Sequence, residues 1–352
     1  MAFTIAMVLA FIVYCRTFAQ RKERIEMKKI TIDISAVTLI TIVFLSLNAC
    51  GGKKGSNVQD GDSLKGEISL SGAFALYPLA VKWADDFKQL HPDVKIDISA
   101  GGAGKGITDA LADVVDLGMV SRDLADDEIK KGAVGFAVAK DAVVPTINAH
   151  NPNLKAVLSH GLSLKTAAGL WITGKVKTWG QVAGNANPDG ITVYTRSDAC
   201  GAAATWAKWL GKKQEDLIGT GVFGDPGVAS AIQKDPNGIG FNNIGYAYDA
   251  KTGKPNPGIL VVPIDVNDNG KVDPEEDFYA TQAQLVKAIA DGRYPSPPAR
   301  DLFFVTHGKP TKPVVIAFLK FVLSKEGQKE NIPQGYITIS QDKINNSLQQ
   351  LH

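Results

Sequence analysis

Residues 67–107 read EISLSGAFALYPLAVKWADDFKQLHPDVKIDISAGGAGKGI and contain two strand-turn-helix units in succession. Residues 67–70 have the apolar alternation of a strand, and residues 76–90 repeat apolar side chains at the spacing of an amphipathic helix. Residues 94–99 are again an alternating strand, and the glycine-rich turn 101–106 leads into a second helix. This βαβα order predicts an α/β fold with a largely parallel sheet.

Short apolar runs alternate with helical patterns along the rest of the chain. Residues 116–120 read as a strand. Residues 135–148 read as a long apolar strand, interrupted by Asp141 and Pro145, that passes from one lobe into a second. Helical periodicity is found in residues 202–210, 283–291 and 313–326.

Composition limits the class of protein. The 38 basic and 36 acidic residues give a formal net charge of +2, and no sustained basic stripe occurs, so we expect no nucleic-acid partner. The 45% hydrophobic and 21% charged content argues against general disorder and against a polytopic membrane protein. At 352 residues the chain exceeds the roughly 250 residues at which single cores stop growing, which favours two lobes.

Residues 1–50 have the features of a leader. Lys28 and Lys29 precede an apolar run, and the sequence Leu-Asn-Ala-Cys ends at Cys50, an order that resembles the lipobox of bacterial lipoproteins. We therefore expect a lipid on Cys50, a flexible tether over residues 51–65, and an exported protein anchored to the cell envelope, periplasmic or on the outer face of the membrane. A retained transmembrane helix is the alternative, but the apolar run is shorter than the roughly 20 residues that span a bilayer.

A second apolar run lies still closer to the start, at residues 1–14. Two consecutive export signals make little physical sense, so we expect translation to start at Met27. A two-helix membrane anchor is the alternative. With Cys15 in the leader and Cys50 lipidated, Cys200 is the one cysteine of the mature part, and no internal disulfide is expected.

Three strand-to-helix turns have the form of an anion site: residues 72–77, 101–106 and 198–203. Such turns direct backbone N–H groups, at the positive end of a helix dipole, toward an anion. Arg196, and Arg122 or Lys105, would add positive charge, and an arginine fork matches an oxyanion in geometry. An ordinary tight connection explains any one of these turns, but the ordered set of three favours an anion site.

Four segments, in this order, resemble the phosphate-binding component of ABC importers: SGAFALYPLAVKWADDF (71–87), GGAGKGI (101–107), VDLGMVSRDL (115–124) and YTRSDACGAAATW (194–206). The resemblance extends over residues 66–339. It implies a type II periplasmic-binding-protein fold, α/β and two-lobed, in which each lobe is a mainly parallel sheet flanked by helices and a two-stranded hinge joins the lobes. Lobe I would comprise residues 66–145 and 256–345, and lobe II residues 146–255.

The same resemblance implies a monomeric binding protein, not an enzyme, that delivers phosphate or a related small oxyanion to ABC permease subunits. The ligand-binding positions that it implies are Ala75, Leu76, Ala103, Gly104, Arg122, Arg196, Asp198, Cys200, Gly201 and Ala202. Ala75, Ala103, Cys200 and Ala202 stand where the family usually has Ser or Thr, and Arg122 where some members have an aspartate. Each lost hydrogen bond to a charged ligand would cost roughly 1.5–3 kcal/mol. A different, larger solute, or a calcium-stabilised surface or sensory protein without a transport role, are the alternatives.

Residues 265–276 read DVNDNGKVDPEE and match the twelve-residue EF-hand loop. Gly270 occupies the sixth position, where the chain must bend sharply. We expect a structural calcium ion that fixes the connection into a helix near Phe278; an acidic, solvated turn is the alternative. The predicted ligands are Asp265, Asn267, Asn269, the backbone carbonyl of Lys271, Asp273 and Glu276.

The sequence contains no GxSxG, HExxH, CxxC or Walker motif, and its five histidines are scattered. We therefore predict no enzymatic activity. Cys200 lies at a predicted helix N-terminus, where a thiolate would be favoured. Because no histidine is near it in the sequence, we expect a small packed or ligand-lining thiol.

Overall fold

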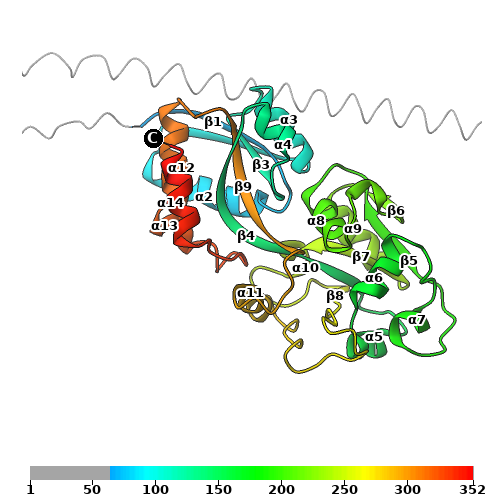
Figure 1. Ribbon diagram of the computed structural model, residues 1–352. Helices are drawn as coiled ribbons and strands as arrows, with labels where there is room; N and C mark the ends of the chain where they lie inside the picture. The colour runs from blue at the N-terminus through cyan, green and yellow to red at the C-terminus, as the bar shows by residue number, and fades with distance from the viewer. Residues whose placement is uncertain (1–63, 352) are drawn as a thin grey trace, which may run out of the picture. The chain divides into compact units, whose positions relative to one another are not determined.

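The long apolar segment forms one 16-residue strand, β4 (Ala133–Asn148), in the computed structural model, which describes residues 64–351 (Figure 1). The first part of β4, as far as Ala142, pairs antiparallel with β9 (Ala299–His307). Its second part pairs antiparallel with β7 (Gly238–Asn243) and β8 (Ile259–Val261). β4 and β9 therefore form the two-stranded connection between the lobes.

Lobe I is built on the strand order β2-β1-β3-β9-β4. β1 (Gly66–Gly72) runs parallel to β2 (Val94–Ala100) and to β3 (Leu117–Val120). Helix α2 (Tyr77–Leu90) buries one apolar face, including Trp83 and Phe87, whose spacing of four residues places both on the same side. This core also contains side chains from the C-terminal helices, so the two ends of the described chain are folded together.

Lobe II continues the order through β4-β7-β5-β6. β5 (Thr192–Arg196) is parallel to both β7 and β6 (Thr220–Val222). Its core contains three tryptophans and a phenylalanine that contact one another by their rings: Trp171, Trp206, Trp209 and Phe241. The remaining helices of residues 64–351 are α3 (Ala103–Leu111), α4 (Asp126–Lys130), α5 (Leu154–His160), α6 (Leu164–Trp171), α7 (Trp179–Ala183), α8 (Gly201–Trp209), η1 (Gln214–Asp216), α9 (Gly224–Lys234), α10 (Ile244–Ala247), α11 (Gln282–Ala290), α12 (Pro313–Leu323), α13 (Lys325–Lys329) and α14 (Gln341–Gln349).

The predicted α/β fold is confirmed. Four strand pairs in the described sheet are parallel, and each of the four antiparallel pairs involves β4 or β9. The prediction did not include the short helices α4, α5, α6, α7 and α10, nor the longer helices α9 and α14. The helix expected near Phe278 is absent there, because the chain remains irregular until Thr281 accepts a hydrogen bond from Gln284 N–H and starts α11.

The buried clusters show how the chain divides its cores. One core joins residues 68–139 to residues 302–351, and a second contains residues 143–262. A third cluster gathers Tyr248, Tyr279 and Tyr294 beside the hinge and takes up most of the chain between β8 and β9. The predicted lobe limits at 145/146 and 255/256 remain predictions, as do the leader and Cys50, which lie outside the described residues.

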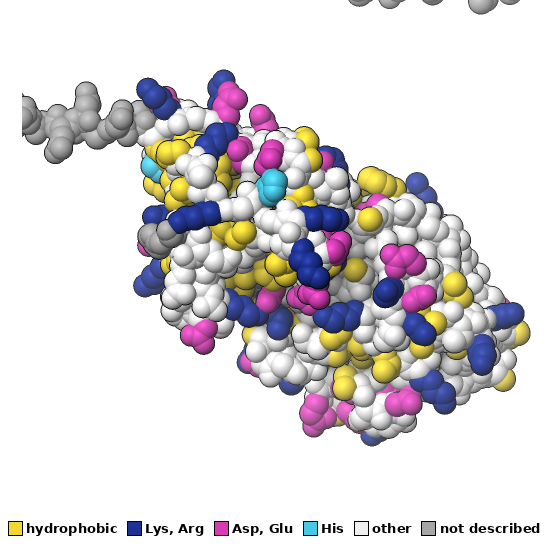
Figure 2. Space-filling model, turned by 45° about the horizontal axis from the view of Figure 1, so that its top comes forward, with side chains coloured by type: hydrophobic (Ala, Val, Ile, Leu, Met, Phe, Trp, Pro, Cys, Tyr) yellow, Lys and Arg dark blue, Asp and Glu magenta, His cyan; other side chains and the backbone are white. Residues whose placement is uncertain are grey.

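Two surface properties of residues 64–351 complete the description. None of their helices is both long and apolar enough to cross a bilayer. On the face displayed in Figure 2, Lys and Arg side chains are interspersed with Asp and Glu.

Candidate functional site

The three predicted strand-to-helix turns converge where the lobes meet. Gly104 N–H, in the first turn of α3, donates across the boundary to Ala199 O, 3.0 Å away. The turn between β1 and α2 is tied to lobe II, because Tyr246 Oη–H donates to Phe74 O at 3.3 Å. The structure thus brings together turns that lie about a hundred residues apart in the sequence.

Gly201 marks the closest approach between the lobes. A Cβ atom at this position would lie 2.2 Å from Ser121 Oγ and 2.3 Å from Ser121 O. Ser121 is a buried residue of the segment that follows β3, in lobe I, whereas Gly201 begins α8 in lobe II. Only a residue without a side chain allows α8 to contact lobe I in this way.

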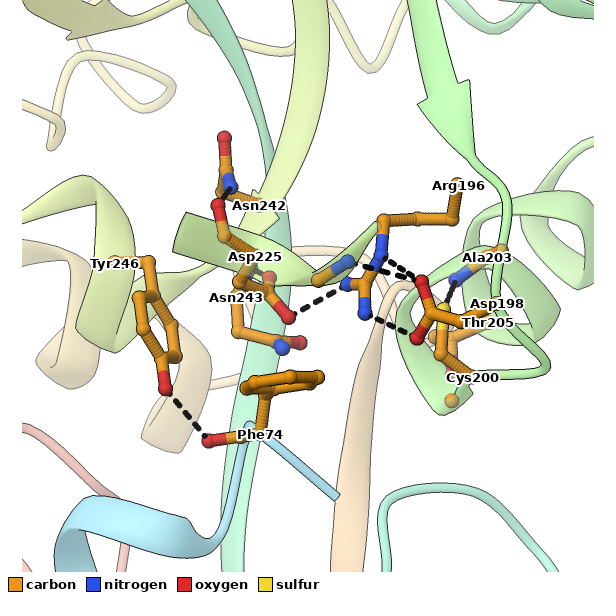
Figure 3. A network of polar contacts seen from close by, with 12 residues as sticks. Phe74, Arg196, Asp198, Cys200, Ala203, Thr205, Asp225, Asn242, Asn243 and Tyr246 are labelled. Carbon is orange, nitrogen blue, oxygen red and sulfur yellow. Dashed lines mark hydrogen bonds and ion pairs between the residues drawn. The ribbon is translucent and has the colours of Figure 1, made fainter. Parts of the chain in front are cut away.

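Arg196 lies at the centre of a buried polar network (Figure 3). Its Nε and Nη2 groups donate to the two oxygens of Asp198 at 2.8 and 2.6 Å, and Nη1 donates to Asp225 Oδ2 at 2.6 Å. The side chain of Arg196 is 0% exposed. Phe74 of lobe I covers it, with the guanidinium carbon 5.7 Å from the ring centroid. The sequence predicted Arg196 and Asp198 in the site, but neither Asp225 nor Phe74.

The network keeps Arg196 protonated, and its carboxylates compensate the positive charge of the guanidinium. Burial alone would lower the pKa of Arg196, but the carboxylates of Asp225 and Asp198 outweigh burial and raise it. Asp225 is itself held by Asn243 N–H at 2.9 Å. One cation and two carboxylates leave an excess of one negative charge, so Arg196 serves to organise the site more than to attract an anion.

A second buried ion pair, Arg300 with Asp141, lies on the hinge strands β9 and β4. Arg300 of β9 donates through Nε to Asp141 of β4 at 3.0 Å, and through Nη1 to Gly201 O at 2.6 Å and Thr205 Oγ1 at 3.1 Å. It also donates to Asn243 Oδ1. Arg300 therefore connects both hinge strands to the first turn of α8. Burial raises the pKa of Asp141 to about 6, although Arg300 acts in the opposite direction.

Cys200 caps α8 as a packed thiol. Its Sγ atom accepts a hydrogen bond from Ala203 N–H at 3.4 Å. Burial raises the pKa of Cys200 to about 12, an effect that exceeds the lowering by Arg196. The thiolate that a helix N-terminus would favour is therefore disfavoured here. The neighbouring positions predicted for the ligand are all buried: Ala75, Leu76, Ala103 and Ala202.

The other predicted cations do not join the network of Arg196. Arg122 forms a fork with Glu128 of α4, with Nη1–Oε2 and Nη2–Oε1 distances of 2.8 and 2.7 Å. Lys105 pairs with Asp109 within α3. Neither residue therefore brings its charge to the meeting point of the turns.

The predicted calcium loop has its acidic ends buried. Asp265 is 2% exposed and Glu276 7% exposed. The carboxylate of Asp265 accepts hydrogen bonds from Asn269 N–H (3.2 Å) and Gly270 N–H (2.9 Å), and Glu276 accepts from Val266 N–H (2.8 Å). Within residues 64–351, neither carboxylate forms an ion pair with a Lys or Arg.

Gly270 has φ +78°, the left-handed conformation that the sharp bend requires. Asp273 is turned toward the amides of Asn267 and Asn269 and toward Lys271 Nζ, 2.7 Å away. In the described part of the chain, no three His, Cys, Asp or Glu side chains gather closely enough to hold a metal. The loop's oxygen set depends on amides and a backbone carbonyl as well, and Asp273 would have to leave Lys271 to complete it.

The residues that the sequence did not reveal are those that hold the turns in place. Asp225, Asn243 and Arg300 come from three separate elements, so no local motif joins them. One signal was present: Asp141 interrupts an otherwise apolar strand, and a buried carboxylate requires a partner.

Two α/β lobes, joined by paired hinge strands and contacting each other through helix N-termini, define a two-lobed binding protein. A family model described as the PBP superfamily domain matches residues 57–326. The chain belongs to this superfamily.

Known proteins resemble this chain in sequence and in fold. Phosphate-binding protein PstS of Bacillus subtilis (strain 168) is 26% identical over 314 residues, covering 84% of this chain and 90% of the relative. The protein of the same name from Methanocaldococcus jannaschii is 28% identical over 371 residues, covering 90% and 93%. A substrate-binding protein from Clostridium perfringens, solved with bound phosphate, has a TM-score of 0.64 at 24% identity and covers 78% of this chain and 100% of that chain.

Proposed function

We propose that this chain is the exported solute-binding component of an ABC importer and that it binds phosphate or a related small oxyanion between its lobes. The observation that carries the proposal is the convergence of the turns before α2, α3 and α8, which direct helix N-termini from both lobes at one place. The names of the relatives, which span nearly the same length, support the choice of phosphate.

Binding requires the lobes to separate and close again. Gly104 N–H is already bonded to Ala199 O, so an anion at this turn would replace that contact. Because Arg196 is neutralised and Ala75, Ala103 and Ala202 carry no hydroxyl, backbone N–H groups would supply most of the recognition. We expect an affinity weaker than that of a site with a free arginine and serine or threonine hydroxyls, by about tenfold or more for each lost charged hydrogen bond.

Titration calorimetry with orthophosphate tests the proposal, with sulfate as the matched oxyanion. We expect saturable 1:1 heat with phosphate and a weaker response to sulfate. If phosphate does not bind, or binds only in the millimolar range, phosphate is ruled out as the ligand. A larger solute, or a surface or sensory role without transport, would then be favoured. A permease and an ATPase encoded beside this chain would separate transport from the sensory role.

We propose in addition that the chain acts as a monomer and is held at the membrane by a lipid on Cys50, from which it delivers its ligand to the permease. The support is the order of basic residues, apolar run and cysteine in the sequence. Cys50→Ala should release the protein from membranes or leave an uncleaved precursor. Fractionation and migration identical to those of the unmodified chain would contradict the anchor.

A calcium ion in the loop 265–276 is also proposed, with a structural role. Two buried carboxylates, Asp265 and Glu276, lie at the ends of one loop, and within residues 64–351 neither forms an ion pair with a Lys or Arg. A divalent ion would compensate their charge. The loop is fixed to lobe II, because Val272 N–H donates to Ser159 O at 2.9 Å. The ion would thus stabilise the contact between this loop and the end of α5.

A further inference from the structure

A cavity of about 480 Å³ lies between the lobes beside the hinge. We call it the hinge-side pocket. Lobe I contributes Arg122 to Ala125, and α8 of lobe II contributes Thr205 and Lys208. Lys140 of β4, the start of β9 and Lys343 of α14 complete the wall. The volume lies in the range of pockets that hold small organic ligands.

The wall of the hinge-side pocket is rich in cationic side chains. It contains five cationic side chains and two carboxylates, an excess of three positive charges. Two of the cations are fixed by carboxylates behind the wall, Arg122 by Glu128 and Arg300 by Asp141. With Glu128 and Asp141 counted, the excess falls to one positive charge, so the unpaired and exposed lysines decide what the pocket can bind.

Three lysines remain that can contact a ligand. Lys140 forms no side-chain ion pair or hydrogen bond within residues 64–351. Lys208 pairs with Asp123 at 2.8 Å, with both side chains largely exposed (64% and 73%), and Lys343 pairs with Asp301. The exposed Lys208–Asp123 pair contributes little free energy, so Lys208 can turn to a bound anion at small cost. Lys343 is itself about half-exposed, although its partner Asp301 is largely buried.

Most of the remaining wall is apolar, apart from Thr205 and Ser296. Leu124, Ala204 and Pro297 line the cavity together with the lysines. An inorganic oxyanion would leave these groups without a contact, whereas an anion attached to an organic body would cover them. We propose that the hinge-side pocket is a second ligand site, for a phosphate ester of a small alcohol or sugar, with the phosphate held by Lys140, Lys208 and Lys343. None of the residues that line the hinge-side pocket belongs to the turns 72–77, 101–106 and 198–203. The proposed second site therefore does not depend on phosphate binding at those turns.

Calorimetry with glycerol 3-phosphate tests the proposal, with glycerol and orthophosphate as controls. The full chain should bind the ester, and Lys140→Ala combined with Lys343→Ala should weaken that binding at least tenfold. Lys165→Ala, an exposed lysine of α6 away from the pocket, should leave it within twofold of the unmodified chain. Should the double variant fail to fold, judged by its thermal melt, the single variant Lys140→Gln should show a smaller loss in the same direction.

The two sites can be told apart by competition. If the ester occupies the hinge-side pocket, saturating orthophosphate should not displace it, and the lysine variants should leave orthophosphate binding unchanged. Simple competition between the two ligands, no binding of the ester, or ester binding unaffected by the lysine variants would each overturn the proposal. A failure of orthophosphate to bind would contradict the proposed function alone.

Discussion

Arg196 shows that a correctly predicted residue can have a different role from the one its type suggests. An arginine in a glycine-containing turn indicates an anion ligand, yet this guanidinium is enclosed by Asp198 and Asp225 and covered by Phe74. A buried charge without its partner is far more costly than a buried pair. The arginine and both carboxylates therefore depend on one another.

Arg196→Ala should destabilise the fold by about 3–5 kcal/mol, because Asp198 and Asp225 would remain buried without their cation. The measurement is the free energy of unfolding in urea. Arg293→Ala is the control. The Arg293–Asp291 pair is partly exposed and has a long N–O distance of 3.6 Å, so its loss should cost less than about 1 kcal/mol. Equal losses in the two variants would show that the Arg196 network does not stabilise the fold.

Asp141 should make stability depend on pH. Burial raises its pKa from 3.8 to about 6, so between these values the folded chain holds a proton that the unfolded chain releases. This contribution to stability is complete below about pH 3.8 and is lost as the pH rises through about 6, by about 3 kcal/mol in total.

Urea unfolding at pH 4 and pH 7 measures this contribution. Asp141→Asn cannot titrate and should lose about 2.4 kcal/mol less than the unmodified chain over that interval. Asp85→Asn, an exposed carboxylate of α2, should retain the full dependence. If Asp141→Asn and the unmodified chain change in parallel, the pKa of Asp141 is not raised.

At the scale of the elements, periodicity and turn composition predicted the first strand-turn-helix units and the long strand β4, but neither the hinge strand β9 nor the short helices. β1, α2 and β2 lie within one or two residues of their predicted ranges, because each has a strong local pattern. α3 begins at Ala103, earlier than predicted, because the helix starts inside the glycine-rich turn. α9 and α14 were missed, since each buries few large apolar side chains, Val228 and Ile232 in α9 and Ile344 in α14. Asp225 and Phe74 were missed for a different reason: they lie far from Arg196 in the sequence, and local patterns do not show which distant segments the fold brings together.

The calcium loop is the element whose sequence predicts its own chemistry. Calcium that binds the folded loop and not the unfolded chain must raise stability, by about 2.7 kcal/mol when free calcium is one hundred times its dissociation constant. The melting temperature should therefore fall in chelator and recover in millimolar calcium.

Glu276→Gln should remove most of that difference, because an amide cannot provide a charged, bidentate contact. Glu275→Gln changes the adjacent, exposed carboxylate and should respond to calcium like the unmodified chain. A melting temperature of the unmodified chain that is the same in chelator and in calcium would show that residues 265–276 form only a polar turn.

At the scale of the whole described chain, the lobes are joined by β4 and β9 and contact each other through turns that depend on small residues. Ser121 against Gly201 and Gly104 against Ala199 are backbone contacts that a side chain would block. A binding protein of this kind closes on its ligand, and the free energy of closure contributes to the affinity. Residues that permit closure should therefore affect binding without touching the ligand.

The titration of orthophosphate into Gly201→Ala tests this account most directly. The added methyl group would lie 2.2 Å from Ser121 Oγ, so the lobes can no longer meet, whereas Gly190→Ala adds a methyl group that meets nothing within 4 Å. We predict that the unmodified chain and Gly190→Ala bind phosphate equally and that Gly201→Ala binds at least tenfold more weakly, with thermal melts that show all three folded. No binding by the unmodified chain, or equal binding by Gly201→Ala, would contradict phosphate capture by closure of the two lobes.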